Sequence, residues 1–195
     1  MSKIYYLMGK SSSGKDTLYK EVKEEFPELR TITLYTTRPI REGERDGAEY
    51  HFVTKDDLDR YEKEGKLIEL RTYHTVYGDW HYATVDDGEV DPSQADYLVI
   101  GTLESYEKMK EYYGAKTVVP LYVEVEDGER LRRALAREQA QEIPKYDEMC
   151  RRFLADKEDF SEENLKKAGI TRRYHNVDKV QCLEEIKREI QHGKL

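Results

Sequence analysis

Cysteine is scarce in this chain of 195 residues, and the two that occur, Cys150 and Cys182, have no cysteine or histidine at metal-ligand spacing. A zinc site and a disulfide framework are therefore not expected, and a reducing compartment fits best. The chain also has no apolar run near the roughly 20 residues that span a bilayer, and no basic start followed by an apolar signal core. We expect a soluble protein of the cytoplasm.

Positive charge is also in deficit, since 33 Lys and Arg residues face 41 Asp and Glu residues, for a formal net charge of -8. This balance argues against general binding to nucleic acid or to an anionic membrane. An anionic ligand must therefore enter a locally basic site. Charged residues (38%) and tyrosines (16) are plentiful, and with 37% hydrophobic residues the composition is that of one folded domain.

Short apolar runs alternate with amphipathic segments along the chain. This alternation predicts an α/β fold with a mostly parallel central sheet covered on both faces. Two polar excursions, near residues 33–95 and 126–160, interrupt it. Strands are predicted at 3–8, 67–85, 96–101, 117–125 and 171–177, with two short ones in 30–54. Helices are predicted at 15–26, 55–66, 102–113, 127–142, 144–160 and 178–190.

Some local features of these helices are also predicted. Thr54 followed by Asp57 resembles a capping box, and Thr102 has the character of an N-cap. The last helix has an apolar stripe that we expect to face the core. Its members are Val180, Leu183, Ile186 and Ile190.

The stretch GKSSSGKDT joins a predicted buried strand to a predicted helix. In a phosphate loop, glycines let backbone N–H groups turn toward phosphate oxygens, a lysine neutralises charge and the next hydroxyl meets magnesium. Gly9, Gly14 and Lys15 fit this pattern. An ordinary Gly/Ser turn with a solvated lysine is the alternative, and the flanking strand and helix disfavour it. The residues predicted to bind ATP are Gly9, Lys10, Ser11, Ser12, Ser13, Gly14, Lys15, Asp16 and Thr17.

Asp16 stands where the loop usually has a hydroxyl residue. Its carboxylate would repel a triphosphate unless it points outward or helps to hold magnesium through water. A Gly-Lys-x-Thr ending is similar to that of nucleoside monophosphate kinases such as adenylate kinases. We therefore expect ATP as the phosphoryl donor, with Mg²⁺, and Thr17 as the hydroxyl nearest the metal.

A second group of polar residues lies between Thr36 and Val53. Arg38 and Arg41 are three residues apart, and guanidinium forks suit a dianionic phosphate. Tyr50 can add a phenolic hydrogen bond. From the charges alone, a basic hairpin paired with its own acidic residues is an equal alternative.

Together these motifs resemble the guanylate kinase family, which transfers phosphate from ATP to GMP. Its run of Thr-Thr-Arg, two residues, Arg, one residue, Gly-Glu, and then Gly, two residues, Tyr, one residue, Phe-Val is present in full. Further on come an Ile-Glu pair, a Tyr-Gly pair, and the segments RRALAR, CRRF and HNVD. The resemblance implies a P-loop kinase three-layer fold in one domain, 1–195. Its parts would be a core (1–32, 96–125 and 161–195), an acceptor-binding lobe (33–95) and a helical lid (126–160).

The resemblance also implies roles for single residues. Glu69 would accept hydrogen bonds from the adjacent N1–H and N2 donors of guanine. The acceptor's phosphate would be held by Arg38, Arg41, Tyr50 and Tyr77. Charge on the transferring phosphoryl group would be stabilised by Lys15, Arg133, Arg137 and Arg152. One of the three lid arginines is expected to form only a surface ion pair.

Three positions that read the base depart from the family pattern. Leu34 and Tyr35 replace a serine, Asp79 follows the Tyr-Gly pair, and Gly101 ends a strand that usually ends in an acid. We hypothesise that Asp79 is a second carboxylate facing guanine and that Thr102 supplies a hydroxyl. A site that hydrogen-bonds its substrate discriminates by roughly 10⁴-fold or more, so changed contacts can change the acceptor.

Two alternatives to a GMP kinase therefore stay open. One is a related kinase of another nucleoside monophosphate or a ribose bisphosphate, which Asp79 and Gly101 favour. The other is a non-catalytic guanylate-kinase-like binding module, which Gly14 and Lys15 disfavour. The charged segment 156–169 is expected to be an extra piece of the lid.

Overall fold

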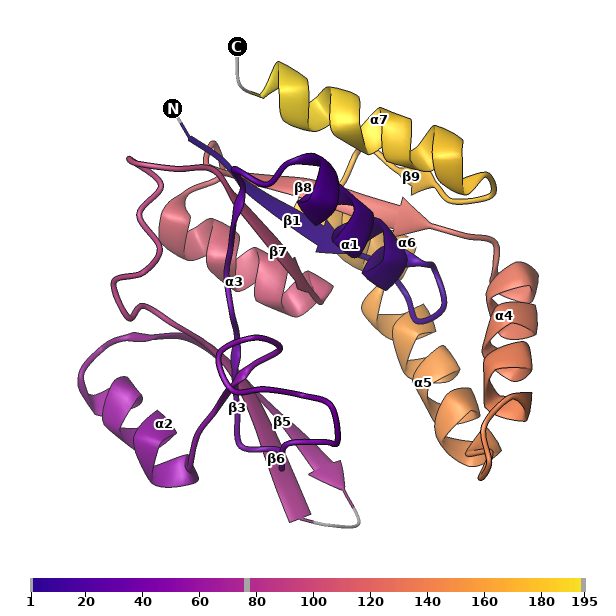
Figure 1. Ribbon diagram of the computed structural model, residues 1–195, viewed down its shortest axis with the longest axis horizontal. Coiled ribbons are helices and arrows are strands. Elements are labelled where there is room, and N and C mark those ends of the chain that lie inside the picture. Colours follow the sequence, from indigo (N-terminus) through magenta and orange to yellow (C-terminus); the bar gives the residue numbers. More distant parts are fainter. Residues whose placement is uncertain (1, 76–77, 194–195) are drawn as a thin grey trace.

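A parallel sheet forms the centre of the protein, and helices cover both of its faces (Figure 1). The computed structural model describes residues 2–75 and 78–193, and the strand order is β2-β7-β1-β8-β9 with parallel neighbours. Parallel neighbours need crossover connections, which the helices supply. The strands are β1 (Ile4–Met8), β2 (Arg30–Thr31), β7 (Tyr97–Gly101), β8 (Val118–Glu124) and β9 (Tyr174–His175).

Side chains of β1 alternate between the two faces of this sheet, and each set packs on different helices. Tyr5 and Leu7 share a buried cluster with α1 and α7. Ile4, Tyr6 and Met8 share the other cluster with α3 and α6. The expected α/β fold in three layers is therefore confirmed. The covering helices are α1 (Lys15–Glu25), α3 (Leu103–Tyr113), α6 (Glu162–Ala168) and α7 (Lys179–His192).

The buried stripe of α7 differs in one member from the predicted one. Cys182, Ile186 and Ile190 are fully buried and Leu183 is partly buried, whereas Val180 is 67% exposed. Each residue turns the helix by about 100°, so Val180 points about 200° away from Cys182. The prediction for Val180 was wrong because the stripe is set by the four-residue steps from Cys182.

A second sheet, with the order β4-β3-β6-β5, lies below the first in Figure 1. Helix α2 (Lys55–Lys63) packs on it through Leu58, which meets Ala83. The predicted capping box is present, because the Thr54 side chain accepts from the Asp57 N–H while Asp57 accepts from the Thr54 N–H. The strands are β3 (Tyr35–Thr36), β4 (His51–Phe52), β5 (Leu67–Thr75) and β6 (Gly78–Val85).

Residues 30–54, expected to hold two short strands, contain three. The first, β2, joins the main sheet, and β3 and β4 belong to the second sheet. These two are parallel, so the segment is not a hairpin. The loop of residues 37–50 is long enough to return the chain to the start of β3, so β4 can run parallel to it. Within this connection the Asp46 carboxylate accepts from the N–H of Phe52 on β4.

Helices α4 (Asp127–Gln139) and α5 (Tyr146–Asp159) pack on each other and extend away from the main sheet (Figure 1). The segment 156–169 was expected to be an extra piece of this pair, and this prediction was wrong. It ends α5 and forms α6, and Phe160, Leu165 and Ala168 are buried in the core against α3. Among the described helices, none is long and apolar enough to cross a membrane.

Candidate functional site

The predicted phosphate loop connects the buried end of β1 to the start of α1. Gly14 has φ 84°, and a Cβ there would lie 2.4 Å from Asn176 Nδ2. A Cβ on Gly9 would lie 2.5 Å from the Val123 carbonyl oxygen. Both positions therefore require glycine, and the loop is pressed between β8 and the β9–α7 turn. The first N–H groups of a helix have no intrahelical partner, which makes the start of α1 suited to an anion.

Lys15 and Asp16 occupy different environments in the first turn of α1. The Lys15 side chain is 17% exposed, and its Nζ lies 3.6 Å from an oxygen of Asp16. The Asp16 side chain is 80% exposed, and Thr17 is exposed as well. The Asp16 carboxylate therefore points outward, and any anion at the loop meets the lysine first.

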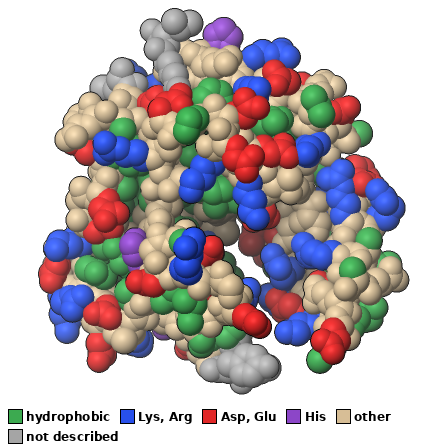
Figure 2. Space-filling view, viewed as in Figure 1, with side chains coloured by type: hydrophobic (Ala, Val, Ile, Leu, Met, Phe, Trp, Pro, Cys, Tyr) green, Lys and Arg blue, Asp and Glu red, His purple; other side chains and the backbone are tan. Residues whose placement is uncertain are grey.

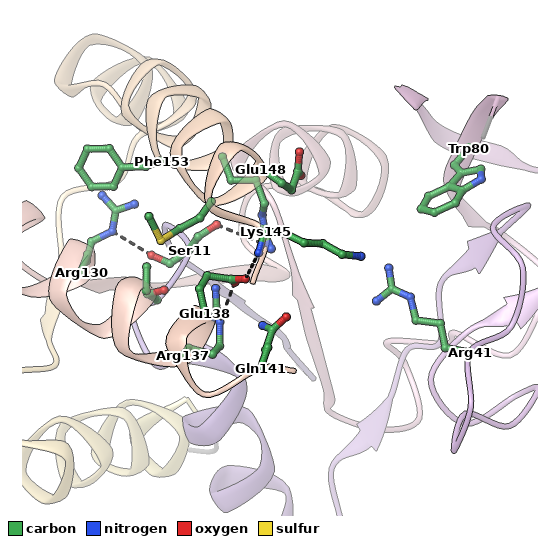
Figure 3. Close-up of a pocket in the computed structure, with 14 residues that line it drawn as sticks. Ser11, Arg41, Trp80, Arg130, Arg137, Glu138, Gln141, Lys145, Glu148 and Phe153 are labelled. Carbon is green, nitrogen blue, oxygen red and sulfur yellow. Dashed lines mark hydrogen bonds and ion pairs between the residues drawn. The ribbon is translucent and has the colours of Figure 1, made fainter. Parts of the chain in front are cut away.

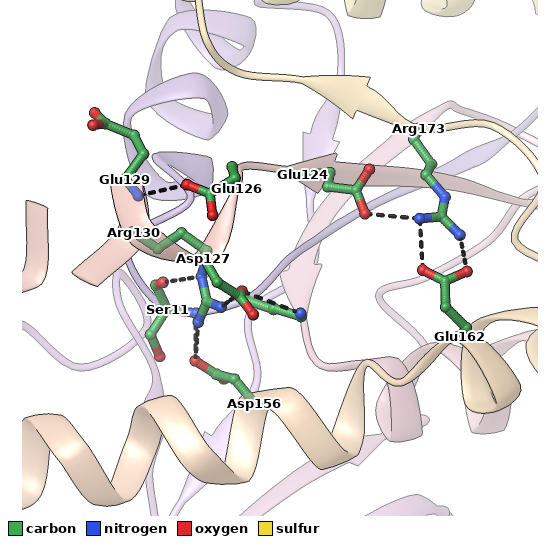
Figure 4. A network of polar contacts seen from close by, with 10 residues as sticks. Ser11, Glu124, Glu126, Asp127, Glu129, Arg130, Asp156, Glu162 and Arg173 are labelled. Carbon is green, nitrogen blue, oxygen red and sulfur yellow. Dashed lines mark hydrogen bonds and ion pairs between the residues drawn. The ribbon is translucent and has the colours of Figure 1, made fainter. Parts of the chain in front are cut away.

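Arg130 ties the predicted phosphate loop to helices α4 and α5, the predicted lid (Figure 4). Its guanidinium is 1% exposed and donates to the Ser11 carbonyl (3.0 Å), to Asp127 (2.6 Å) and to Asp156 (3.1 Å). Asp156 also accepts from the Ser11 N–H at 2.7 Å. Sequence reasoning did not assign Arg130 or Asp156 to the site, because their common contact with Ser11 spans more than a hundred residues of chain.

The three lid arginines predicted to be catalytic lie in different places. Arg152 donates to the Ser11 hydroxyl at 3.1 Å, directly at the loop. Arg133 lies beside Gly14 and donates to Glu129 (2.7 Å) and to the Asn176 carbonyl (3.1 Å). Arg137 is half exposed, 3.8 Å from Glu138. Two of the three thus contact or border the loop, and Arg137 lines the cleft next to it.

A cleft of about 510 Å³ separates the lid from the second sheet (Figure 3). Arg41 and Trp80 form its wall on the second sheet, and Figure 3 shows the Arg41 and Lys145 side chains entering from opposite sides. The space-filling view shows the hollow between the two parts, with Lys and Arg side chains around it (Figure 2). The lid side of the cleft is lined by, among others, Arg130, Arg137, Lys145, Arg152 and Phe153.

Arg38 and Arg41, predicted to hold the acceptor's phosphate, differ in exposure. Arg38 is 3% exposed and donates to both oxygens of Glu44, at 2.8 and 3.0 Å, with its guanidinium 5.5 Å from the rings of Tyr50 and Phe52. Burial would lower the pKa of Arg38, but the Glu44 carboxylate and Tyr82 together outweigh it and the pKa is raised. Arg41 is exposed to the cleft. Pairing with an acid of the same loop thus occurs at Arg38.

Two other predicted acceptor residues are Tyr50 and Tyr77. Tyr50 is half-buried, with its ring 5.6 Å from that of Tyr82. Burial raises the pKa of Tyr50, and the positive charges of Arg38 and Arg71 oppose the rise. Tyr77 lies outside the described residues.

Glu69, predicted to read guanine, is buried against a cation that sequence reasoning missed. Arg71 Nε lies 3.0 Å and its Nη2 3.3 Å from the Glu69 oxygens. Burial would lower the pKa of Arg71, but the Glu69 carboxylate, with Tyr6 and Tyr73, outweighs it and the pKa is raised. The sequence did contain a signal for this pair: Glu69 and Arg71 are two residues apart, and in a strand that spacing places both side chains on one face.

Asp79 does not join Glu69, in contrast to what we hypothesised. It pairs with His74 across the β5–β6 ladder, and its carboxylate lies 2.7 Å from the exposed imidazole. His74 faces away from Glu69, because side chains alternate along a strand, and Asp79, opposite His74, faces the same way. Thr102 does lie beside the pair, since its hydroxyl accepts from Arg71 at 3.0 Å.

Gly101 and Leu34 also have structural explanations for their departure from the family pattern. A Cβ on Gly101 would lie 2.0 Å from the hydroxyl oxygen of Tyr6, so a fully buried tyrosine takes the space of any side chain there. Leu34 is buried in the core cluster around β1 and α3. Neither position contributes a polar side chain to the site.

Comparison with known proteins agrees with this geometry. The family model for guanylate kinase matches residues 1–89. Residues 1–89 are thus similar to the guanylate kinases. Guanylate kinases from Chlorobium luteolum (41% identical over 75 residues, 38% of this chain and 36% of that protein) and Helicobacter hepaticus (32% over 119 residues, 59% and 58%) are among the relatives. The chain thus matches about a third to three fifths of the length of these relatives.

The likeness in fold to the guanylate kinase family extends over the whole chain. A crystal structure of guanylate kinase from Anaplasma phagocytophilum superposes with a TM-score of 0.66 at 18% identity, covering 98% of this chain and 85% of that one. At this identity the likeness establishes the fold. The likeness in fold therefore includes α4, α5 and α7, which lie beyond the residues that the family model matches.

Proposed function

We propose that the protein transfers the γ-phosphoryl group of ATP to GMP, giving ADP and GDP, by in-line displacement. The observation that carries the proposal is the cleft itself: the loop that bears Lys15 borders one side, and the segment that bears Arg38 and Arg41 borders the other. Its 510 Å³ is in the range of small-molecule sites. The nucleotides would be its partners, with residues 33–95 holding the acceptor and 126–160 acting as a lid.

Phosphoryl transfer asks a protein chiefly for positioning and charge neutralisation. Lys15 would face the phosphates of ATP, and Arg152, already at the Ser11 hydroxyl, would stabilise the transferring group with Arg133 and Arg137. Arg41 would meet the acceptor's phosphate from the opposite wall. Arg38, held by Glu44, would fix the shape of the loop around that phosphate and add charge to it.

The start of α1 fits a magnesium ion that arrives with ATP. Mg²⁺ is usually bound through one or two carboxylates together with substrate phosphates and several waters. Asp16 and Thr17 offer a carboxylate and a hydroxyl on the exposed first turn next to Lys15. When bound there, the ion would neutralise charge on the phosphates. The outward carboxylate of Asp16, 3.6 Å from Lys15 Nζ, would approach it through water.

A different acceptor is the second candidate, and one observation favours it. The Glu69 carboxylate, which would read guanine, is already bonded to Arg71. Another nucleoside monophosphate, or a ribose bisphosphate, would not need that carboxylate. A non-catalytic binding module is not favoured by any contact described above.

ATP turnover with a panel of acceptors tests the proposal. The panel contains GMP, dGMP, AMP, UMP, CMP and ribose bisphosphate, and Lys15→Met serves as the blank. We expect turnover with GMP well above that with AMP and its loss in the blank. Turnover with GMP no better than with AMP would refute GMP as the acceptor, and no turnover with any compound would refute the kinase.

A further inference from the structure

Lys145 is a cation of the cleft that the proposed reaction does not yet use. It lies at the start of α5, and its side chain enters the cleft opposite Arg41 (Figure 3). Ser11 and Ser12 of the predicted phosphate loop line the same cleft. The donor and acceptor phosphates of the proposed reaction would meet between the loop and Arg41, so Lys145 faces the charge that both of them bring.

The two acidic residues that line the cleft do not bind the Lys145 side chain. Glu148 accepts from Arg151 with both of its oxygens, at 2.7 Å each, and its pKa is lowered chiefly by Arg151 and to a smaller extent by Lys145. Glu138 accepts from the backbone N–H of Lys145 at 3.1 Å and lies 3.8 Å from Arg137. Across residues 2–75 and 78–193, the Lys145 ammonium has no hydrogen bond or ion pair.

The position of Lys145 is one where its side chain contributes nothing to the helix. At an N-cap, a side-chain oxygen accepts from a backbone N–H of the first turn, and an ammonium has no acceptor. Helix α5 accordingly has no side-chain cap. Side-chain caps are present on α2, α3, α6 and α7, from Thr54, Thr102, Ser161 and Asp178.

The backbone of Lys145 is nevertheless held firmly. Its N–H is bound by Glu138, which is 7% exposed, and its carbonyl accepts from the Met149 N–H at 3.0 Å. A fixed backbone therefore carries an unbound cation into the cleft, at a position where local helix chemistry favours a different residue. Departures from a local rule of this kind are expected at functional sites.

We propose that Lys145 is a further catalytic residue of the phosphoryl transfer proposed above, on which this inference rests. Its ammonium contacts the phosphoryl group in transit, from the side opposite Arg41. The bond between the γ-phosphorus and the oxygen that leaves with ADP breaks, and a phosphate oxygen of GMP bonds to that phosphorus. Charge spread over the equatorial oxygens accepts hydrogen bonds from Lys145, which transfers no proton.

The kinetics of three variants test this role. Lys145→Met keeps the stem without the charge and should lower kcat about 10²-fold while changing KM for ATP and GMP less than about threefold, because the contact forms in the transition state. Lys145→Arg keeps a cation and should recover most of that loss. Lys157→Met, an exposed lysine of α5 outside the cleft lining, is the control and should leave kcat unchanged. If Lys145→Met retains more than about half of kcat, Lys145 has no part in the transfer.

Lys145→Ser distinguishes this role from a structural one. The bond to Glu138 uses the backbone, so it survives the change, and serine is a favoured N-cap. We therefore expect Tm not to fall, while kcat falls as in Lys145→Met. A fall in Tm that accompanies the lost activity would assign Lys145 to the folding of α5 and overturn the proposal.

Binding without turnover separates this inference from the proposed function. Adenosine and guanosine joined by a pentaphosphate hold both nucleotides together, with the phosphate chain crossing the cleft. Calorimetry should show this analogue bound about tenfold more weakly by Lys145→Met, with ATP alone and GMP alone bound as by the unmodified protein. If the unmodified protein phosphorylates no acceptor but this loss appears, the kinase is refuted and the contact of Lys145 stands. If GMP is phosphorylated and neither kcat nor binding of the analogue depends on Lys145, the kinase stands and the role of Lys145 is refuted.

Discussion

Replacing Arg130 by Met should destabilise the protein and weaken ATP use together, because one guanidinium holds the phosphate loop and both lid helices. Its side chain is 1% exposed, and it donates to the Ser11 carbonyl, Asp127 and Asp156. Methionine keeps most of the apolar stem but none of the donors. The variant therefore leaves the Asp156 carboxylate, 16% exposed, without its cation.

The size of the effect follows from these exposures. Removing one partner of a fully buried ion pair costs about 3–5 kcal/mol. Asp127 is 40% exposed and regains water, so we expect roughly 2–4 kcal/mol for Arg130→Met. In a domain of this size each kcal/mol lowers Tm by about 2–4 °C, so Tm should fall by roughly 4–16 °C.

Calorimetric or urea unfolding of Arg130→Met beside Arg132→Ala measures this effect. Arg132 is on the same helix and pairs with Glu129, but its side chain is 73% exposed. A pair of that kind contributes about 0–1 kcal/mol. Arg130→Met should also raise KM for ATP, since the Ser11 carbonyl loses its donor. If Arg130→Met lowers Tm no more than Arg132→Ala does, the contacts of Arg130 do not hold the loop to α4 and α5.

Two further predictions concern the core. Gly101→Ala should cost about 1–3 kcal/mol, because its Cβ would lie 2.0 Å from the buried Tyr6 hydroxyl oxygen, and a double-mutant cycle with Tyr6→Phe should show partial relief; additive effects would contradict this. Burial raises the pKa of the Cys182 thiol to about 12, so a thiol reagent should modify only exposed Cys150 in the native protein, and Cys182 only as it unfolds. Two equally fast thiols would contradict that burial.

The elements of the core were predictable because their sequence signals are local. The strand before Gly9, the capping box at Thr54 and the N-cap at Thr102 each depend on residues within one turn or one strand, and the structure has all three. Strand partners were not predictable in this way. Nothing local in residues 30–54 distinguishes a hairpin from two parallel strands. The second partner of β3 is β6, which lies outside this segment.

The site divides along the same line. Residues of the phosphate loop could be grouped from sequence because they are consecutive. Arg130 and Asp156 could not, because both reach Ser11 from more than a hundred residues away. Asp79 was misplaced for a different reason. The face on which its side chain lies depends on the register of β6 with β5, and a shift of one residue moves a side chain to the opposite face.

Glu69 shows why a motif residue alone does not establish a binding role. Its position matches the family pattern, but Arg71, two residues later on the same face, already donates to both of its oxygens. Gly101 departs from the same pattern for a steric reason, because the buried Tyr6 hydroxyl occupies the space that a side chain at 101 would need. The contacts of one cation on β5 and of one buried tyrosine on β1 could not be read from the motif, because both depend on elements that lie far apart in the sequence.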